Sequence, residues 1–268
     1  MAKPVKKRKN RQDSASGMKK PVQDPAHFAM EKAFTVSRKI KKILKQARSA
    51  EDLAAGMLEI LSLADKACEV IIDDFPPPHP IACKKGCGYC CRVKVEATIP
   101  EILHLAEYMK KTLTPPALAV VRGRISSVSL KTSAREENYW VEQGIICPFL
   151  VDDSCLIHPV RPFACRCINS MDIVGCRKFF ETKDPETKIL QYSYQKQVYT
   201  ACEMGLQLGV AQAGLEASWV ELTRALLIAL DLRKGTKDWL AGKVLFASAY
   251  VKDPLPWYME KAGHQSHI

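Results

Sequence analysis

The segment at positions 83–91 reads Cys83-Lys84-Lys85-Gly86-Cys87-Gly88-Tyr89-Cys90-Cys91 and places four thiols within nine residues. Five further cysteines follow, at positions 147, 155, 165, 167 and 176, so these two groups contain nine of the eleven cysteines of the chain. Close spacing brings soft thiolate ligands together at a small cost in loop-closure entropy, and the two glycines allow a positive φ where the loop turns. The segment therefore predicts a multi-thiolate metal site around which the rest of the chain folds.

Cys90 and Cys91 are adjacent, which limits how they can share a ligand sphere. In an extended chain neighbouring side chains point to opposite faces, and in a helix they diverge by about 100°. We therefore expect the two thiols to serve different metal ions, or different atoms of one cluster. Eight or nine thiols would satisfy two four-ligand sites.

The compartment decides whether clustered thiols bind metal or form disulfides. The N-terminus is basic but lacks the apolar stretch of a secretory signal, so we expect a cytoplasmic protein with reduced thiols. The odd number of cysteines also argues against a closed disulfide framework. The longest apolar run, Ala225–Leu230, is far shorter than the roughly 18 residues of a membrane span, so no membrane partner is expected.

The net charge of +11 is concentrated at the N-terminus. Eight basic and two acidic residues before residue 25 contribute +6, so the rest of the chain carries +5. Two tetrathiolate zinc sites, each about −2 by ligand count, would bring that remainder close to neutral. Residues 1–24 contain almost no bulky apolar side chains, and we expect a disordered basic tail there. Two interpretations of such a tail stay open: a solvated segment without a partner, and a contact for a protein or nucleic-acid partner.

Helical periodicity dominates the sequence on both sides of the cysteines. It begins at Pro25, resumes after Ser49 as an N-cap, and ends at the proline-rich connector 74–80. A capping box at Thr98 and Glu101 opens another helix. The remaining helices are predicted at about 115–138, 188–208, 216–232 and 236–250.

Two cysteines outside the clustered groups, Cys68 and Cys202, lie within apolar helical stripes and are predicted to be core thiols. Between Cys147 and Cys155, two apolar runs flank the acidic turn 151–154, which predicts a tight hairpin that brings these thiols together.

The predicted fold is mainly α: a single helical domain around an irregular cysteine-rich metal-binding centre with a short β-hairpin. Its expected bounds are residues 25–252, with the cysteine cluster at 80–180 and a C-terminal tail at 253–268.

The spacing Cys83-x3-Cys87-x2-Cys90 is similar to the loop that holds a [4Fe–4S] cluster in radical S-adenosylmethionine enzymes. Those enzymes set the loop after the first strand of a βα barrel. Here the preceding residues are helical and then proline-rich, so the context favours a different fold. An S-adenosylmethionine-dependent enzyme stays open as an alternative.

Several motifs in order resemble the YkgJ-type cysteine-cluster family, also called the CxxCxxCC or zinc- or iron-chelating domain. They are Cys83-x3-Cys87-x2-Cys90-Cys91, then Cys147-Pro148-Phe149-Leu150, then Cys155-x-Ile157-x3-Arg161-Pro162-x2-Cys165-Arg166, with Asn169 to Asp172 and Cys176 resembling a subgroup. The resemblance covers roughly residues 80–180. It implies a metal-ligand set of Cys83, Cys87, Cys90, Cys91, Cys147, Cys155, Cys165 and Cys176.

The sequence departs from the family pattern at two positions: His158 stands where the family usually has Tyr, and Cys167 is an additional thiol. The two guanidinium groups of Arg161 and Arg166 could donate hydrogen bonds to thiolate sulfur and offset its charge. His104, on the capped helix, is expected to be exposed or hydrogen-bonded, and Asn169 and Asp172 to serve in a cap or turn.

The sequence thus predicts a metal-binding protein that holds an iron–sulfur cluster (of the [4Fe–4S] kind) or Zn²⁺ through clustered thiolates. The same cysteine pattern is similar to that of flagellin lysine N-methylase, so an alternative is a protein methyltransferase using S-adenosylmethionine. A third alternative is a zinc-stabilised nucleic-acid-binding protein. Whether the chain is an enzyme is left open at this point.

Overall fold

The computed structural model describes residues 21–132, 138–184 and 186–251. Within these ranges the chain is mainly helical, with ten α-helices, three short 3₁₀ helices and two antiparallel sheets of two strands each. This confirms the predicted fold class. Residues 1–20 of the expected basic tail lie outside the described part of the chain, as does the expected C-terminal tail at 253–268.

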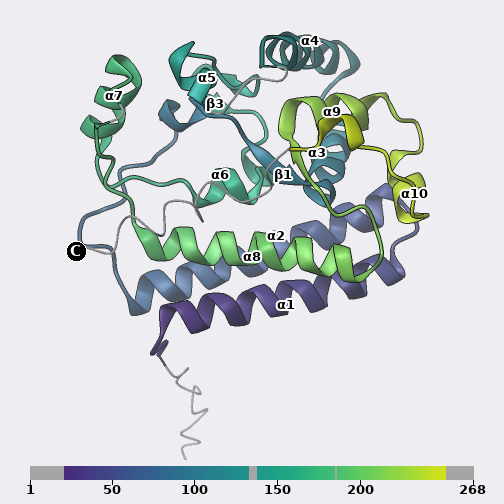
Figure 1. Ribbon diagram of the computed structural model, residues 1–268, viewed down its shortest axis with the longest axis horizontal. Helices are drawn as coiled ribbons and strands as arrows, with labels where there is room; N and C mark the ends of the chain where they lie inside the picture. The colour runs from purple at the N-terminus through teal and green to yellow at the C-terminus, as the bar shows by residue number, and fades with distance from the viewer. Residues whose placement is uncertain (1–20, 133–137, 185, 252–268) are drawn as a thin grey trace, which may run out of the picture.

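Three long helices form one layer of the molecule (Figure 1). They are α1 (Pro25–Gln46), α2 (Ala50–Asp74) and α8 (Ser193–Gln212). Ser49 caps α2 as predicted: its hydroxyl accepts from the backbone N–H of Asp52, whose carboxylate accepts in return from the N–H of Ser49. The apolar stripes face one another and bury Val36, Ile40, Met57, Ile60, Cys202 and Leu206. We call these helices the three-helix scaffold.

Two glycines on α8 let it approach α1 closely. A Cβ atom at Gly205 would lie 2.1 Å from the carbonyl oxygen of Ala33, and one at Gly209 would lie 2.7 Å from that of Ser37. Such distances are far below van der Waals contact, so only glycine permits this backbone approach.

A second group of helices packs on the scaffold. It consists of α3 (Ile99–Thr112), α4 (Pro115–Thr132), α9 (Leu222–Asp231) and α10 (Gly235–Leu240). Strand β1 (Glu96–Thr98) pairs antiparallel with β4 (Trp219–Glu221), and the pairing register joins Ala97 to the fully buried Val220. This short sheet leads directly into α3 on one side and α9 on the other.

Two predicted helices at the C-terminal end were too long. The helix expected at 216–232 begins only at Leu222, because residues 219–221 pair with β1 and the Glu221 carboxylate then caps α9. The helix expected at 236–250 ends at Leu240. Gly242 has a φ of 86°, a left-handed conformation that stops a helix, and a short 3₁₀ turn, η3 (Ala247–Ala249), follows.

The cysteine-rich segment has only short elements, which lie above one end of the scaffold in Figure 1. They are η1 (Tyr89–Arg92), α5 (Asn138–Glu142), β2 (Leu150–Val151), β3 (Ser154–Cys155), η2 (His158–Val160), α6 (Phe163–Cys167) and α7 (Ile173–Thr182). Loops and single turns therefore position most of the thiols.

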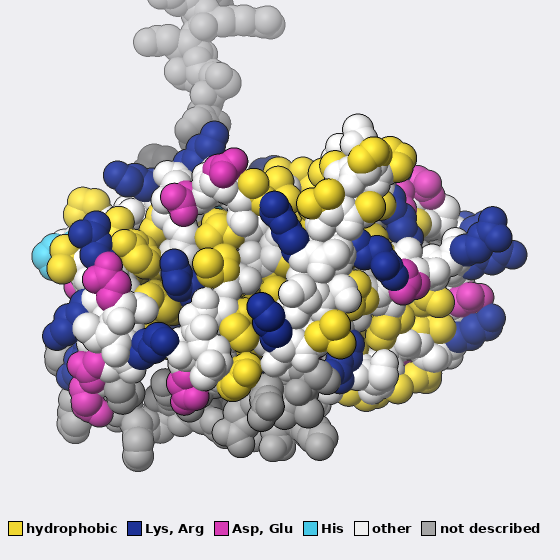
Figure 2. Space-filling view, turned by 90° about the horizontal axis from the view of Figure 1, so that it is seen from above, with side chains coloured by type: hydrophobic (Ala, Val, Ile, Leu, Met, Phe, Trp, Pro, Cys, Tyr) yellow, Lys and Arg dark blue, Asp and Glu magenta, His cyan; other side chains and the backbone are white. Residues whose placement is uncertain are grey.

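The surface over these upper elements carries mixed side chains. Figure 2 shows Lys and Arg scattered among hydrophobic and uncharged side chains rather than gathered in one basic patch. None of the helices within the described ranges is long and apolar enough to cross a membrane.

Candidate metal centre

The first cysteine loop turns at Gly86, whose φ of 86° confirms the predicted positive value. Gly88 does not follow that prediction: its φ is −107°, and it matters for space instead. A Cβ atom there would lie 2.8 Å from Leu150 in the hairpin. Cys90 and Cys91 then follow on η1. The two glycines thus have different tasks, one in turning the loop and one in docking it on the second cysteine group.

The predicted hairpin is present, with β2 paired to β3. Asp152 and Asp153 form its turn with φ values of 46° and 55°, which two-residue hairpins require of both central residues. Cys155 lies on β3, opposite Leu150. The backbone N–H of Cys147 donates to the carbonyl of Cys91 at 2.8 Å, so a hydrogen bond joins the two cysteine groups directly.

Cys165 is positioned by a buried carboxylate. Glu101 accepts hydrogen bonds from the N–H and hydroxyl of Thr98, which confirms the predicted capping box, and also from the N–H of Phe163 at 2.7 Å. Phe163 begins α6, which carries Cys165. Burial raises the pKa of Glu101, and its three donors partly offset that shift. This one side chain therefore fixes the thiol relative to α3.

Cys176 lies on α7, which is docked on the first loop. Tyr89 stacks on Phe180 with ring centroids 6.4 Å apart, and the Nε of Arg177 donates to the Tyr89 hydroxyl at 3.0 Å. Ser170, just before α7, donates its N–H to the sulfur of Cys83 at 3.2 Å. These contacts bring Cys176 to the same side of the loop as Cys83.

The eight predicted ligands thus gather in one region as two sets of three around a pair. Cys83 and Cys176 each lie close enough to Cys87 and Cys90 for ionisation of one thiol to raise the pKa of the other, and we call Cys83, Cys87 and Cys176 the outer thiols. Ionisation of Cys147, Cys155 or Cys90 would raise the pKa of Cys165, so these thiols lie close together. We call Cys147, Cys155 and Cys165 the inner thiols. We call Cys90 and Cys91 the paired cysteines.

Burial and neighbouring thiols disfavour the thiolate form of several of these cysteines. A hydrogen bond with Cys91, followed by burial, raises the pKa of Cys90 far above its ordinary value. Burial raises the pKa of Cys147 to about 12 and that of Cys165 well above its usual range. A bound metal would displace these protons, because thiolate is the ligand form.

Within the described ranges, no three side chains of His, Cys, Asp or Glu stand ready to hold one metal ion. The sulfur atoms are gathered in one region but not closed around a common point. All eleven cysteines, which lie within those ranges, are free thiols, so none is withdrawn into a disulfide.

Residues 82–191 match the family model CxxCxxCC, described as "Putative zinc- or iron-chelating domain". We call residues 82–191 the CxxCxxCC domain after this match. The predicted resemblance is thereby confirmed, and the match extends beyond the last cysteine of the cluster to the loop before α8. The comparisons with curated proteins and with solved structures found no match to the chain.

Two unpartnered donors in the CxxCxxCC domain fit an anionic centre. The Nε atoms of Arg92 and Arg161 are buried and have no hydrogen-bond partner among the described residues. The charge of Arg161 acts to lower the pKa of Cys90, Cys155 and Cys165. Buried donors of this kind are normally satisfied, and thiolate or sulfide sulfur would satisfy them here. Together with the all-thiol donor set, they fit zinc or an iron–sulfur cluster.

Arg166 does not take the role predicted for it. Its guanidinium forms a bidentate ion pair with Asp65 of α2 at 2.8 and 2.9 Å, and it also donates to the carbonyls of Arg161 and Pro159. All these partners are oxygen atoms. Arg166 therefore ties the CxxCxxCC domain to the scaffold instead of reaching sulfur.

The remaining cysteines are core thiols. Cys68 and Cys202 are buried, as predicted, and Cys167 is buried with its sulfur donating to the carbonyl of Ala164. Burial raises the pKa of both Cys167 and Cys202 to about 12. His158 is exposed on η2.

Asn169 and Asp172 have the cap or turn duty expected of them. The Asn169 amide bonds to the N–H and carbonyl of Tyr192, and the Asp172 carboxylate caps α7 by accepting from Val174 and Gly175. Both therefore hold the backbone on either side of Cys176.

The sequence analysis missed two buried polar side chains, one inside the domain and one on the scaffold. His104 was expected to be exposed or hydrogen-bonded; it is buried, and neither ring nitrogen has a partner among the described residues. Burial lowers its pKa to about 4. Glu203 on α8 is also buried. Their helical spacing among apolar residues was the only available signal, and it does not separate a buried polar side chain from an exposed one.

The radical-enzyme context is not present at the first loop. The loop follows α2 and the proline connector, and the described residues contain only the two small sheets given above. A βα barrel would need parallel strands before and after the loop.

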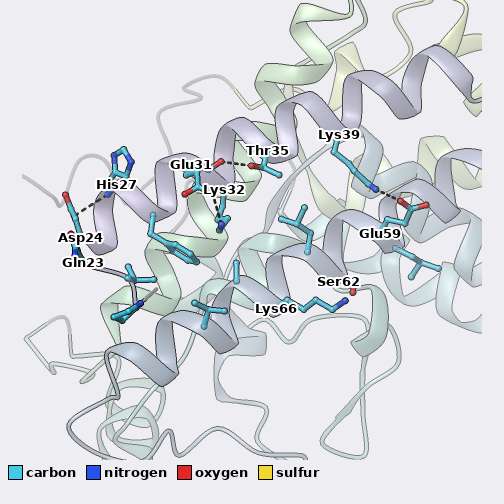
Figure 3. Close-up of a pocket in the computed structure, with 17 residues that line it drawn as sticks. Gln23, Asp24, His27, Glu31, Lys32, Thr35, Lys39, Glu59, Ser62 and Lys66 are labelled. Carbon is cyan, nitrogen blue, oxygen red and sulfur yellow. Dashed lines mark hydrogen bonds and ion pairs between the residues drawn. The ribbon is translucent and has the colours of Figure 1, made fainter. Parts of the chain in front are cut away.

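A large open groove lies elsewhere, between α1 and α2 (Figure 3). It measures about 1350 Å³ and is lined by charged and apolar side chains, among them the ion-paired Lys39 and Glu59. No cysteine lines it. The metal chemistry therefore has to be sought at the thiols and not in this groove.

Proposed function

We propose that the CxxCxxCC domain binds metal, as zinc or an iron–sulfur cluster, in two four-thiolate centres. The outer thiols would form one centre with one of the paired cysteines, and the inner thiols would form the other with the second. Each centre then has the four soft ligands that zinc and iron–sulfur clusters take in proteins.

The observation that carries this proposal is the position of Cys90 between the two sets. Cys90 is an electrostatic neighbour of Cys83 and Cys176 among the outer thiols and of all three inner thiols. The Cys90 and Cys91 thiols hydrogen-bond to each other, so the pair could supply one ligand to each of two adjoining centres. The spacing of the first loop, Cys83-x3-Cys87-x2-Cys90, favours iron–sulfur over zinc.

On binding, the metal would replace the thiol protons, and the two centres would carry negative charge. The buried Nε atoms of Arg92 and Arg161 would donate hydrogen bonds to that charge. The chain itself thus supplies ligands, charge compensation and burial, and the metal supplies the cross-link between the first loop, the hairpin, α6 and α7.

The test is elemental analysis with visible absorption on the full-length protein purified without oxygen. We expect two equivalents of zinc, or iron with matching acid-labile sulfide and broad visible absorption. Cys87→Ala and Cys165→Ala should each lose metal, whereas the matched core variant Cys202→Ala should keep it. Equal metal content in the three variants would refute the ligand assignment.

A further inference from the structure

The two thiol sets differ in their surroundings. The inner thiols all pack against the hydrophobic core, beside the fully buried Phe149 and Phe163. Within the described residues, none of the outer thiols joins that packing. Cys83 is exposed, and so are the three residues that follow it, Lys84, Lys85 and Gly86.

The two sets are also held differently. The inner thiols sit on the hairpin and on α6, which Glu101 and the Arg166–Asp65 ion pair tie to α3 and α2. The outer thiols lie between a loop and α7, whose Val174 is 72% exposed. The loop and α7 are joined by the stacking of Tyr89 on Phe180 and by the hydrogen bond from Arg177 to Tyr89. Ser170, just before α7, also contacts Cys83. Opening the outer set therefore disturbs no core packing, whereas opening the inner set does.

Four exposed basic residues adjoin the outer thiols in the chain. Lys84 and Lys85 lie between two of these cysteines in the chain, and Arg177 and Lys178 follow the third; all four are exposed. The acidic side chains of α7 are Glu181, which interacts with Arg177, and Asp172, which is engaged in capping. Exposed cations at the mouth of a site raise the local concentration of anions.

We propose that the outer centre is an exchange site that passes its metal to and from small anionic chelates, while the inner centre is a permanent structural metal. This inference rests on the two-centre function proposed above. The exchange applies to a mononuclear zinc ion and is a substitution of ligands: carboxylate or phenolate donors replace the outer thiolates on Zn²⁺, which stays Zn²⁺, and the freed thiolates take protons from water. The chemical class of partner is therefore a small polyanionic chelate.

Metal release by an anionic chelator tests this. The full chain, loaded with zinc, is mixed with excess 4-(2-pyridylazo)resorcinol, which forms a coloured complex with zinc. We expect two phases of equal amplitude, with the first at least tenfold faster. Cys83→Ser should remove the fast phase and leave the slow one. Release of both equivalents in a single phase, or loss of the slow phase in Cys83→Ser, would overturn the exchange role.

The role of Lys84 and Lys85 in attracting an anionic chelate can be tested separately. Lys84→Gln/Lys85→Gln should slow the fast phase on the order of threefold with the anionic chelator, and not with the neutral chelator TPEN. The matched scaffold variant Lys42→Gln/Lys45→Gln, at two exposed positions of α1, should change neither rate. Equal slowing with both chelators would contradict recognition of an anion. A protein that holds fewer than two equivalents refutes the two-centre function itself, which separates that failure from failure of the exchange role.

Discussion

The three-helix scaffold and the CxxCxxCC domain are stabilised in different ways. The scaffold consists of long helices whose apolar stripes interlock, with backbones in contact at Gly205. The cysteine-rich part of the domain consists of short elements joined by single hydrogen bonds, such as Cys147 to Cys91, and by buried carboxyl groups such as Glu101. Burial of apolar surface holds the first region, and a few directional bonds, with the proposed metal, hold the second. The predictions below test that difference.

The largest effect is expected from Gly205→Ala in the scaffold. The added Cβ would lie 2.1 Å from a backbone oxygen of α1, which cannot move without separating the helices. We expect a loss of about 3 kcal/mol in the free energy of unfolding, more than the gain from the better helix propensity of alanine. Urea denaturation followed by far-UV circular dichroism measures it.

Gly123→Ala on α4 is the matched control, because a Cβ there meets nothing within 4 Å. This variant should be more stable than the parent by about 0.5–1 kcal/mol. If both variants were equally stable, close packing at Gly205 would not be what holds α1 against α8.

The difference between apolar packing in the scaffold and polar contacts in the domain also explains which parts of the fold the sequence could predict. Regular apolar spacing gave the scaffold, including the Ser49 cap, and the acidic turn at 151–154 gave the hairpin. The pairing of β1 with β4 was missed, because strand pairing between residues 96 and 221 depends on tertiary contacts and on no local pattern. Nothing in the sequence marked Gly205 as essential, because the backbone that it must approach belongs to another helix, α1.

For the candidate site, the thiols themselves were identified from spacing and resemblance, while their supports were not. The capping box predicted that Glu101 pairs with Thr98. It did not predict the hydrogen bond from Phe163, which is 62 residues away in the sequence. Arg166 was predicted to donate hydrogen bonds to sulfur because it follows Cys165 directly. It forms an ion pair with Asp65 on α2 instead. Polar partners distant in sequence cannot be read from a single sequence.

A smaller effect is expected from Glu101→Ala, which acts where the two regions meet. It leaves the N–H groups of Thr98 and Phe163 without an acceptor in a buried place, at a cost of about 2 kcal/mol. Because Phe163 begins α6, the variant should also bind metal less tightly at the inner thiols, which a chelator competition titration measures.

Glu107→Ala, also on α3, is the control for this pair of readouts. Glu107 makes an i,i+4 ion pair with Lys111, so about 0.3–0.5 kcal/mol of stability and no metal affinity should be lost. Unchanged metal affinity in Glu101→Ala would mean that Glu101 stabilises α3 without positioning Cys165.

The smallest effect, a gain, is expected from Glu203→Gln on the side of α8 that faces the interior. Burial, followed by the charges of Glu101 and Glu96, raises the pKa of Glu203 well above its ordinary value, and its Oε1 has no partner among the described residues. The folded protein thus binds this proton more tightly than the unfolded chain, in which the carboxyl titrates near about pH 4.3. The stability from this carboxyl is fully present below that pH and is lost as the pH rises toward the folded pKa. Glutamine does not titrate, so the variant should equal the parent near about pH 4 and exceed it by about 1 kcal/mol at neutral pH.

Thermal unfolding of variant and parent at both pH values measures this, with Glu31→Gln at an exposed position of α1 as the control. Comparing the two proteins at the same pH cancels any loss of metal in acid, since both carry the same thiols. The control should show the same small difference at both pH values. A Glu203→Gln variant that is less stable than the parent at neutral pH would mean that the charged carboxylate has a partner that stabilises it. The scaffold would then share the dependence on buried polar contacts that we assign to the CxxCxxCC domain.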